Sequence, residues 1–259
     1  MTAPLSHDAH TESQFGSRAD DYVASAVHAA GEDLAALARF GALSHAAVLD
    51  LGCGGGHVTY AVAPHVRAVT ALDLSQAMLD AVSAEVRRRG LTNVVTRQAS
   101  VEALPFADAS FECVLSRYSA HHWGDVPAAL REAHRVLAPG GRLGLVDVVH
   151  PGPPLLDTHL QAWELLRDPS HVRDYGEAEW RRMLAEAGFV PGAVRRWRVR
   201  MDFPSWIARM GTPEASAAAI RTLQVGAPEP VRSHFAIEDD GSFTLDVMMI
   251  EAEPDGVLD

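Results

Sequence analysis

Residues 48–57 read VLDLGCGGGH, and this stretch decides the fold. The apolar run over residues 46–51 is typical of a buried parallel strand. The run ends in glycines, after which Val58, Ala61 and Val62 fall on one helical face. A strand, a glycine turn and a helix in this order cradle a nucleotide-like ligand at the carboxyl end of a sheet, because glycines let the ligand approach the backbone. The segment therefore predicts a nucleotide-type site in an α/β fold.

The spacing of the glycines indicates which ligand this turn binds. The dinucleotide fingerprint is Gly-x-Gly-x-x-Gly, whereas Gly52, Gly54 and Gly56 are each two residues apart and Asp50 precedes them. An acid at this strand end suits a cationic group better than a pyrophosphate. The pattern resembles the first motif of the class I S-adenosyl-L-methionine (SAM)-dependent methyltransferases, which is acid-x-Gly-x-Gly-x-Gly. The resemblance implies SAM as the cofactor and S-adenosyl-L-homocysteine as its product.

A second acid supports a nucleoside ligand. Asp73 ends the expected second strand, and a carboxylate about 20 residues past the glycine turn accepts hydrogen bonds from ribose hydroxyls. Residues 99–106 resemble the adenine-binding segment of the family, although Ser100 stands where the family usually has an acid. The residues expected to bind the cofactor are Asp50, Gly52, Cys53, Gly54, Gly56, Asp73, Leu74, Met78, Ser100, Val101, Glu102, Ser116 and Arg117.

The segment after the expected fourth strand, residues 117–123, should lie beside the methyl acceptor, because it follows a strand at the carboxyl edge of the sheet. His121 and His122 are the candidate catalytic residues, since imidazole titrates near neutral pH and can act as a general base. Weaker candidates for contacting the substrate are Phe15, Tyr22, His28, Tyr118, His171 and Arg173. A competing metal site would combine His121 and His122 with other residues, but the usual ligand spacing is missing and no metal is expected.

The expected fold class is α/β, with a Rossmann-like, doubly wound sheet of seven strands, mostly parallel with an antiparallel last strand. Residues 194–203 alternate between apolar and charged side chains, which is typical of an edge strand. Residues 247–250 are apolar on both faces, which favours a central position. We therefore expect the last strand, residues 243–252, to lie between the fifth and the sixth.

One methyltransferase domain should span residues 1–259. Its expected parts are a mobile arm (1–16), an N-terminal helical cap (17–40), a SAM-binding core (41–150), the rest of the sheet (151–203 and 239–253) and a helical lid insert (204–238). The alternative for the insert is a peripheral element that supports the sheet edge or a dimer.

Composition excludes some classes of function. The net charge of −12 disfavours nucleic acid as the main partner. The two cysteines have no metal-ligand spacing, no apolar run reaches transmembrane length, and no signal-peptide core is present. We expect a cytoplasmic protein with no membrane span, as a monomer or a homodimer.

The resemblance is strongest over residues 46–150, and its nearest type is the methyltransferase type 11 group, which includes enzymes resembling those of ubiquinone and menaquinone biosynthesis. It implies SAM-dependent methylation of a small-molecule acceptor. Two alternatives stay open. One is a non-catalytic SAM-binding sensor or scaffold. The other is an NAD-linked oxidoreductase, which the glycine spacing and Asp50 disfavour.

Overall fold

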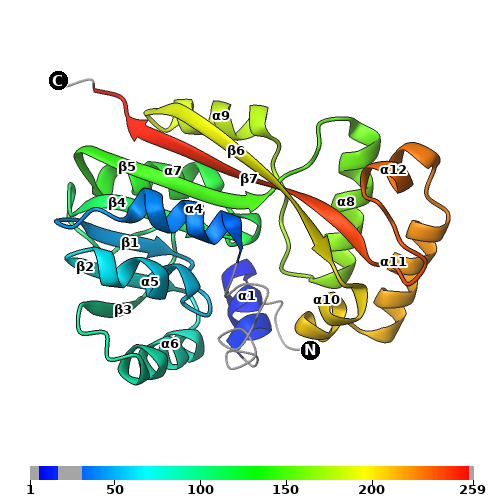
Figure 1. Ribbon diagram of the computed structural model, residues 1–259, viewed down its shortest axis with the longest axis horizontal. Helices are drawn as coiled ribbons and strands as arrows, with labels where there is room; N and C mark the ends of the chain where they lie inside the picture. The colour runs from blue at the N-terminus through cyan, green and yellow to red at the C-terminus, as the bar shows by residue number, and fades with distance from the viewer. Residues whose placement is uncertain (1–5, 17–30, 257–259) are drawn as a thin grey trace.

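The computed structural model of the protein describes residues 6–16 and 31–256. Its elements lie in one seven-stranded sheet with helices on both faces (Figure 1). In chain order they are α1 (His7–Gly16), α4 (Glu32–Gly41), β1 (Ala47–Leu51), α5 (His57–Val62), η1 (Ala63–His65), β2 (Ala68–Asp73), α6 (Gln76–Arg88), β3 (Val94–Gln98), β4 (Phe111–Arg117), η2 (Ala120–His122), α7 (Val126–Val136), β5 (Leu137–Val148), α8 (Pro154–Arg167), α9 (Glu177–Glu186), β6 (Phe189–Met201), α10 (Phe203–Met210), α11 (Glu214–Val225), α12 (Glu229–His234) and β7 (Phe243–Pro254). Over the described ranges, no helix is both long and apolar enough to cross a membrane.

The strand order is β3-β2-β1-β4-β5-β7-β6. Strands β1 to β5 pair in parallel, and β7 runs antiparallel to both β5 and β6. The predicted fold class and the insertion of the last strand between the fifth and the sixth are therefore confirmed. The chain order reverses between β1 and β4, and ligands of doubly wound sheets bind at such a switch point. The glycine turn after β1 and the segment after β4 meet there.

The core has two layers because successive side chains of a buried strand point to opposite faces of the sheet. In β1, Val48 joins the layer beneath α4, where Leu37 is fully buried. Leu49 joins the opposite layer beneath α7, where Leu130 is fully buried. An apolar run without alternation is what a strand covered on both faces requires.

Two expected strands have other boundaries in the structure. Strand β6 runs from Phe189 to Met201, where residues 194–203 were expected, and β7 ends at Pro254 and not at residue 252. Strand β5 begins at Leu137, and residues 139–141 continue it across an irregular register with β4.

Part of the arm expected over residues 1–16 is helical in the described residues. Residues His7–Gly16 form helix α1, which packs against α6. The His7 Nε2 donates a hydrogen bond to the carbonyl oxygen of His122 at 2.7 Å. This partner is 115 residues away, so the local pattern could not reveal the contact. Of the expected cap over 17–40, the described part begins at Gly31 and contains α4.

The segment expected as a lid contains α10, α11 and α12, and the latter two pack against α8 (Figure 1). At the centre of this group Trp163 is fully buried, and its ring lies 5.0 Å from that of Phe235 and 5.5 Å from that of Phe243. The insert and α8 thus pack around a common aromatic core. Helix α10 extends from this group toward the cavity described below.

Candidate active site

A cavity of about 590 Å³ opens at the carboxyl ends of the central strands, a size typical of small-molecule sites. Most of the residues predicted to bind the cofactor line it. These are Asp50, Gly52, Cys53, Gly54, Asp73, Leu74, Met78, Ser100, Val101, Glu102 and Arg117. The predicted catalytic residues His121 and His122 line the same cavity, as does Tyr118. The structure therefore brings the two halves of the predicted site together.

The glycine turn is open toward the cavity. Gly52 and Gly54 have φ angles of 63° and 48°, a left-handed region in which residues with a Cβ are strained. The Asp73 carboxylate accepts hydrogen bonds from the backbone N–H of Gly54 at 2.8 Å and from that of Ser75 at 2.9 Å. A Cβ added at Gly54 would meet no atom within 4 Å. The turn thus leaves space where a ligand would approach the backbone.

Asp50 is 1 % exposed, and its carboxylate faces the start of α5. Its Oδ2 accepts hydrogen bonds from the backbone N–H of Thr59 at 3.0 Å and from the Thr59 hydroxyl at 2.6 Å. Burial raises the pKa of Asp50 to about 7, although both bonds from Thr59 act in the opposite direction. Asp50 therefore ties β1 to α5. Direct binding of a cationic group by Asp50 stays a prediction.

Two of the predicted cofactor residues do not line the cavity. Gly56 caps α5 with a φ of 80°, and a Cβ there would lie 2.6 Å from the ring of Tyr60. Ser116 is buried, and its hydroxyl donates to the carbonyl of Leu51 at 2.8 Å, which links β4 to β1. Both residues support the glycine turn without lining the cavity.

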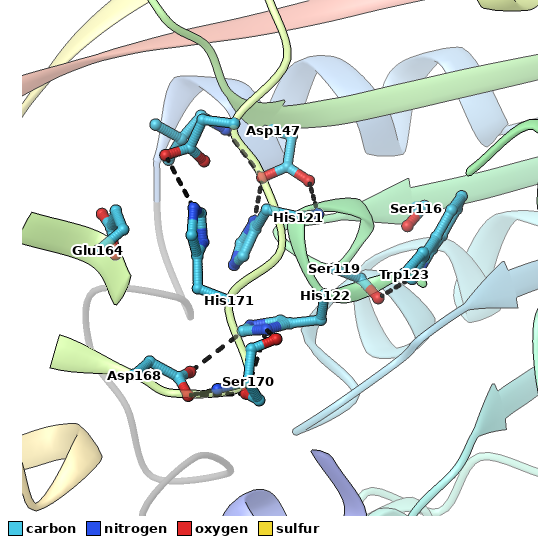
Figure 2. A network of polar contacts seen from close by, with 12 residues as sticks. Ser116, Ser119, His121, His122, Trp123, Asp147, Glu164, Asp168, Ser170 and His171 are labelled. Carbon is cyan, nitrogen blue, oxygen red and sulfur yellow. Dashed lines mark hydrogen bonds and ion pairs between the residues drawn. The ribbon is translucent and has the colours of Figure 1, made fainter. Parts of the chain in front are cut away.

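His121 is held by Asp147 at the end of β5 (Figure 2). Its Nδ1 donates to one carboxylate oxygen of Asp147 at 2.6 Å, and its backbone N–H donates to the other at 3.2 Å. Burial by itself would lower the pKa of His121, but the charge and hydrogen bond of Asp147, helped by Asp174 and Glu164, raise it to about 9. His121 is therefore an imidazolium at neutral pH.

We expect the ring of His121 to titrate near pH 9 in an NMR titration of the wild type, because Asp147 favours its charged form. An unfolded histidine titrates near pH 6.5, so this pair stabilises the fold below about pH 6.5 and loses that contribution as the pH rises to about 9. Asp147→Asn should bring the pKa of His121 down. A wild-type value at or below 6.5 would contradict the assignment.

His122 has the opposite protonation state. Its Nδ1 lies 3.2 Å from the carbonyl of Ser170, and its Nε2 lies 3.8 Å from Asp168. Burial, followed by the charge of His121, lowers the pKa of His122 to about 3. Two adjacent histidines of the same short η2 segment thus carry different charges.

Arg117 and Tyr118 close the cavity on the side of α4. Arg117 donates to the Asp33 carboxylate at 2.7 Å, and the two side chains are only 4 % and 7 % exposed. Tyr118 has a φ of 51°, which is uncommon for a residue with a side chain and is found in sites that the surrounding structure constrains.

His171 and Arg173 do not line the cavity. His171 is buried with its Nε2 3.0 Å from Gln161, while Arg173 binds Asp157 at 2.9 Å and Glu179 at 3.4 Å. They anchor the loop before α9, and the backbone N–H of Val172 in this loop donates to the carbonyl of His121 at 2.8 Å. Of the remaining substrate candidates, Tyr22, His28 and the side chain of Phe15 lie outside the described part of the chain.

Several residues of the cavity were missed from the sequence. They are Asp8 and Thr11 of α1, Glu164 of α8, Asp174 of the following loop, Trp197 of β6 and Trp206 of α10. Asp147 lies at the carboxyl end of β5, and this place in the sheet is a signal for the site. Trp197 lies within the edge strand expected over residues 194–203, whose apolar face lines the cavity.

One group of side chains has the composition of a metal site. Ligand atoms of His121, Asp147 and Asp174 lie within 4.8 Å of one another. However, the two oxygens of Asp147 already accept hydrogen bonds from the ring and backbone of His121 and from the backbone N–H of Val148. A protein-bonded carboxylate of this kind orients a histidine and needs no ion. That the site holds no metal stays a prediction.

Comparison with known proteins identifies the class. Residues 49–145 match a family described as a methyltransferase domain. The chain is 49% identical to the uncharacterized protein YafE of Escherichia coli over 201 residues, which are 78% of this chain and 97% of YafE. It is 35% identical over 246 residues to the uncharacterized methyltransferase YcgJ of Bacillus subtilis, covering 93% and 97% of the two chains.

Solved structures agree with these relatives. The crystal structure of YcgJ matches with a TM-score of 0.83 at 33% identity, covering 86% of this chain and 98% of YcgJ. A putative methyltransferase of Bacillus halodurans matches with a TM-score of 0.82 at the same identity and coverage. The chain belongs to the methyltransferase domain family. Its class is the SAM-dependent methyltransferases, as the resemblance of the glycine turn implied, and SAM is its cofactor.

Proposed function

We propose that the protein transfers the methyl group of SAM to a small-molecule acceptor bound against His121. The observation that supports this is the continuity of one cavity, which runs from the glycine turn to His121, the residue that Asp147 holds from outside the cavity lining. A cofactor bound at the turn and an acceptor bound at the pair would then share one enclosed space.

The residues at the turn fit the cofactor. Gly54 leaves the space that a side chain would fill, and the Asp73 carboxylate stands at the cavity wall, where ribose hydroxyls can donate to it. Ser100 and Val101 would contact the adenine. When bound, SAM supplies an electrophilic methyl group. The protein's own task is therefore to bind, orient and exclude water.

The protonation state of His121 suggests its role. As an imidazolium at neutral pH it can donate a hydrogen bond to an atom of the acceptor other than the one that is methylated, and Asp147 fixes the orientation of its ring. His122 stays neutral beside it. In this arrangement the pair of histidines positions the acceptor, and His121 does not serve as the general base near pH 7, because a base must be deprotonated to act.

The size of the cavity and the names of several relatives both favour a small-molecule acceptor. A volume of about 590 Å³ has room for a small ligand beside the cofactor, and the net charge of −12 disfavours nucleic acid. Among more distant relatives, a demethylmenaquinone methyltransferase of Lactococcus lactis is 35% identical over 130 residues. A ubiquinone/menaquinone C-methyltransferase of Allorhizobium ampelinum is 29% identical over 174 residues.

The test is methyl transfer from methyl-labelled SAM to a fractionated bacterial extract. We expect the label in the low-molecular-mass fraction and not in RNA or protein. His121→Ala should lower the rate at least ~100-fold, because it removes a positioned donor, while SAM affinity stays within about twofold. The matched control is His65→Ala, an exposed histidine outside the cavity, which should behave as the wild type.

Label in RNA or protein would contradict a small-molecule acceptor. Tight SAM binding without transfer to any fraction would favour the sensor or scaffold alternative. Equal rates for His121→Ala and the wild type would remove His121 from the proposed mechanism.

A further inference from the structure

Four buried carboxyl groups gather beside the two histidines, and we name them the acidic cluster. Its members are Asp147, Glu164, Asp168 and Asp174. They come from the end of β5, from α8 and from the loop before α9, and each is at most 6 % exposed. Figure 2 labels three of them around His121, His122 and His171. Buried carboxyl groups take up a proton, or they stay ionised beside a source of positive charge.

The described residues in contact with the cluster supply too few cations. His121 donates to Asp147, and Arg167 lies 3.4 Å from Glu164. His122 and His171 lie 3.8 Å from Asp168 and Asp174 respectively. However, burial lowers the pKa values of these two histidines to about 3 and about 2, so both are neutral. Within the described part of the chain, two cations therefore contact four carboxyl groups.

Asp174 provides an independent sign of a ligand. Its side chain is 1 % exposed and lines the cavity, and its Oδ2 has no hydrogen-bond partner among the described residues. Its backbone N–H donates to Gln161 at 3.1 Å, which holds the residue in place. A buried acceptor without a partner is costly. Glu164 lines the same cavity, so both carboxyl groups can meet a ligand there.

We propose that Glu164 and Asp174 bind the protonated amine of the methyl acceptor, so that the enzyme methylates nitrogen. This inference rests on the proposed function. A cation between the two groups would add positive charge to the two cations that the described residues supply, and an ammonium N–H would give Asp174 Oδ2 its partner. Val148, Trp197 and Trp206 line the same cavity. The acceptor is thus an amine with an apolar or aromatic body.

A carboxylate of the acidic cluster can also accept the proton that the nitrogen must lose before it is methylated. Burial raises the pKa values of Glu164 and Asp174, and each faces further charged groups. The groups that act on this pair are Arg167, His121, Asp168, Asp147 and Asp157. An ammonium gives one proton to a carboxylate of the pair. The freed lone pair forms the bond to the methyl carbon, and the broken carbon–sulfur bond leaves its electron pair on sulfur.

The experiment is calorimetry on the wild type saturated with S-adenosyl-L-homocysteine. The probes are hexylamine, phenethylamine and tryptamine, each beside the alcohol of the same skeleton. We expect at least one amine to bind at least ~10-fold more tightly than its alcohol, since a charge-assisted hydrogen bond is worth about 1.5–3 kcal/mol. Repeating the titration at pH 7 in buffers of different ionisation enthalpy should reveal proton release, because burial raises the pKa values of the free pair and a bound ammonium favours its ionised form.

Glu164→Gln and Asp174→Asn keep the shape of each side chain and remove its charge. Each should weaken the amine at least ~10-fold and leave S-adenosyl-L-homocysteine binding within twofold, which also shows that the variant is folded. Asp80→Asn, an exposed acid of α6, is the matched control and should bind the amine as the wild type does.

Three results would overturn the inference. They are equal binding of amines and alcohols, binding of no amine by a protein that binds S-adenosyl-L-homocysteine, and unchanged amine binding in both variants. Stabilisation by Mg²⁺ or Zn²⁺ that Asp174→Asn abolishes would assign the cluster to a metal and also overturn it. Failure of the wild type to bind S-adenosyl-L-homocysteine is a separate observation and would overturn the proposed function itself.

Discussion

Gly54→Ala is expected to weaken SAM binding by up to ~100-fold while the protein stays folded. Gly54 lines the cavity with a φ of 48°, and a Cβ there would meet no protein atom within 4 Å. The new methyl group would therefore project into the space that the cofactor needs. Overpacking of this kind costs about 1–3 kcal/mol or more, which corresponds to a loss of affinity of up to ~100-fold. Calorimetric titration of SAM measures it.

Gly90→Ala is the matched control. Gly90 follows α6 with a φ of 68°, and a Cβ there would also meet nothing within 4 Å, but the residue lies outside the cavity. Both variants pay the same kind of left-handed strain, about 1–2 kcal/mol. They should lose similar stability, and only Gly54→Ala should lose the ligand. Equal SAM affinity in the two variants would show that the turn does not contact the cofactor.

The largest expected effect on stability comes from Arg117→Ala. Arg117 in β4 and Asp33 in α4 form an ion pair of 2.7 Å whose side chains are nearly inaccessible to water. Removing the arginine leaves the Asp33 carboxylate buried without this cation. Breaking such a buried pair costs about 3–5 kcal/mol in the free energy of unfolding. Urea unfolding at pH 7 measures the loss.

Two comparisons separate charge from packing. The double variant Asp33→Leu, Arg117→Met removes both charges at similar volume and should recover most of the loss, because no unpaired charge stays behind. Arg67→Ala breaks an exposed pair with Glu112, and it should cost no more than about 1 kcal/mol. A loss for Arg117→Ala as small as that for Arg67→Ala would contradict the assignment.

The central fold could be predicted because its signals are local. Residues 46–49 and 247–250 are apolar on both faces, which indicates central strands. The alternation in residues 194–203 marks an edge, so the pattern places the last strand inside the sixth. The glycine turn follows from the spacing of Gly52 and Gly54, which only a close backbone approach explains. These features need no knowledge of distant contacts.

The acceptor side depends on contacts between distant segments. Asp147, Glu164 and Asp174 lie on three segments, and their meeting depends on the path of the loop before α9. Helix α1 depends in the same way on the bond from His7 to His122.

The protonation states of the two histidines could not be predicted from the sequence either. His121 and His122 were both identified as bases from their type and position. Their opposite charges arise from Asp147 on one ring and from burial of the other. A residue's type and place in the chain do not determine its pKa when the neighbours that set it are unknown.

The central claim is that the cavity at the end of β1 and β2 binds SAM through Asp73. Calorimetric titration of SAM into the wild type and into Asp73→Ala tests it most directly. We predict saturable binding to the wild type, and binding about 100-fold weaker in the variant, because hydrogen bonds to a charged group contribute about 1.5–3 kcal/mol each. Binding of NADH in place of SAM, or equal SAM affinity in both proteins, would contradict the account.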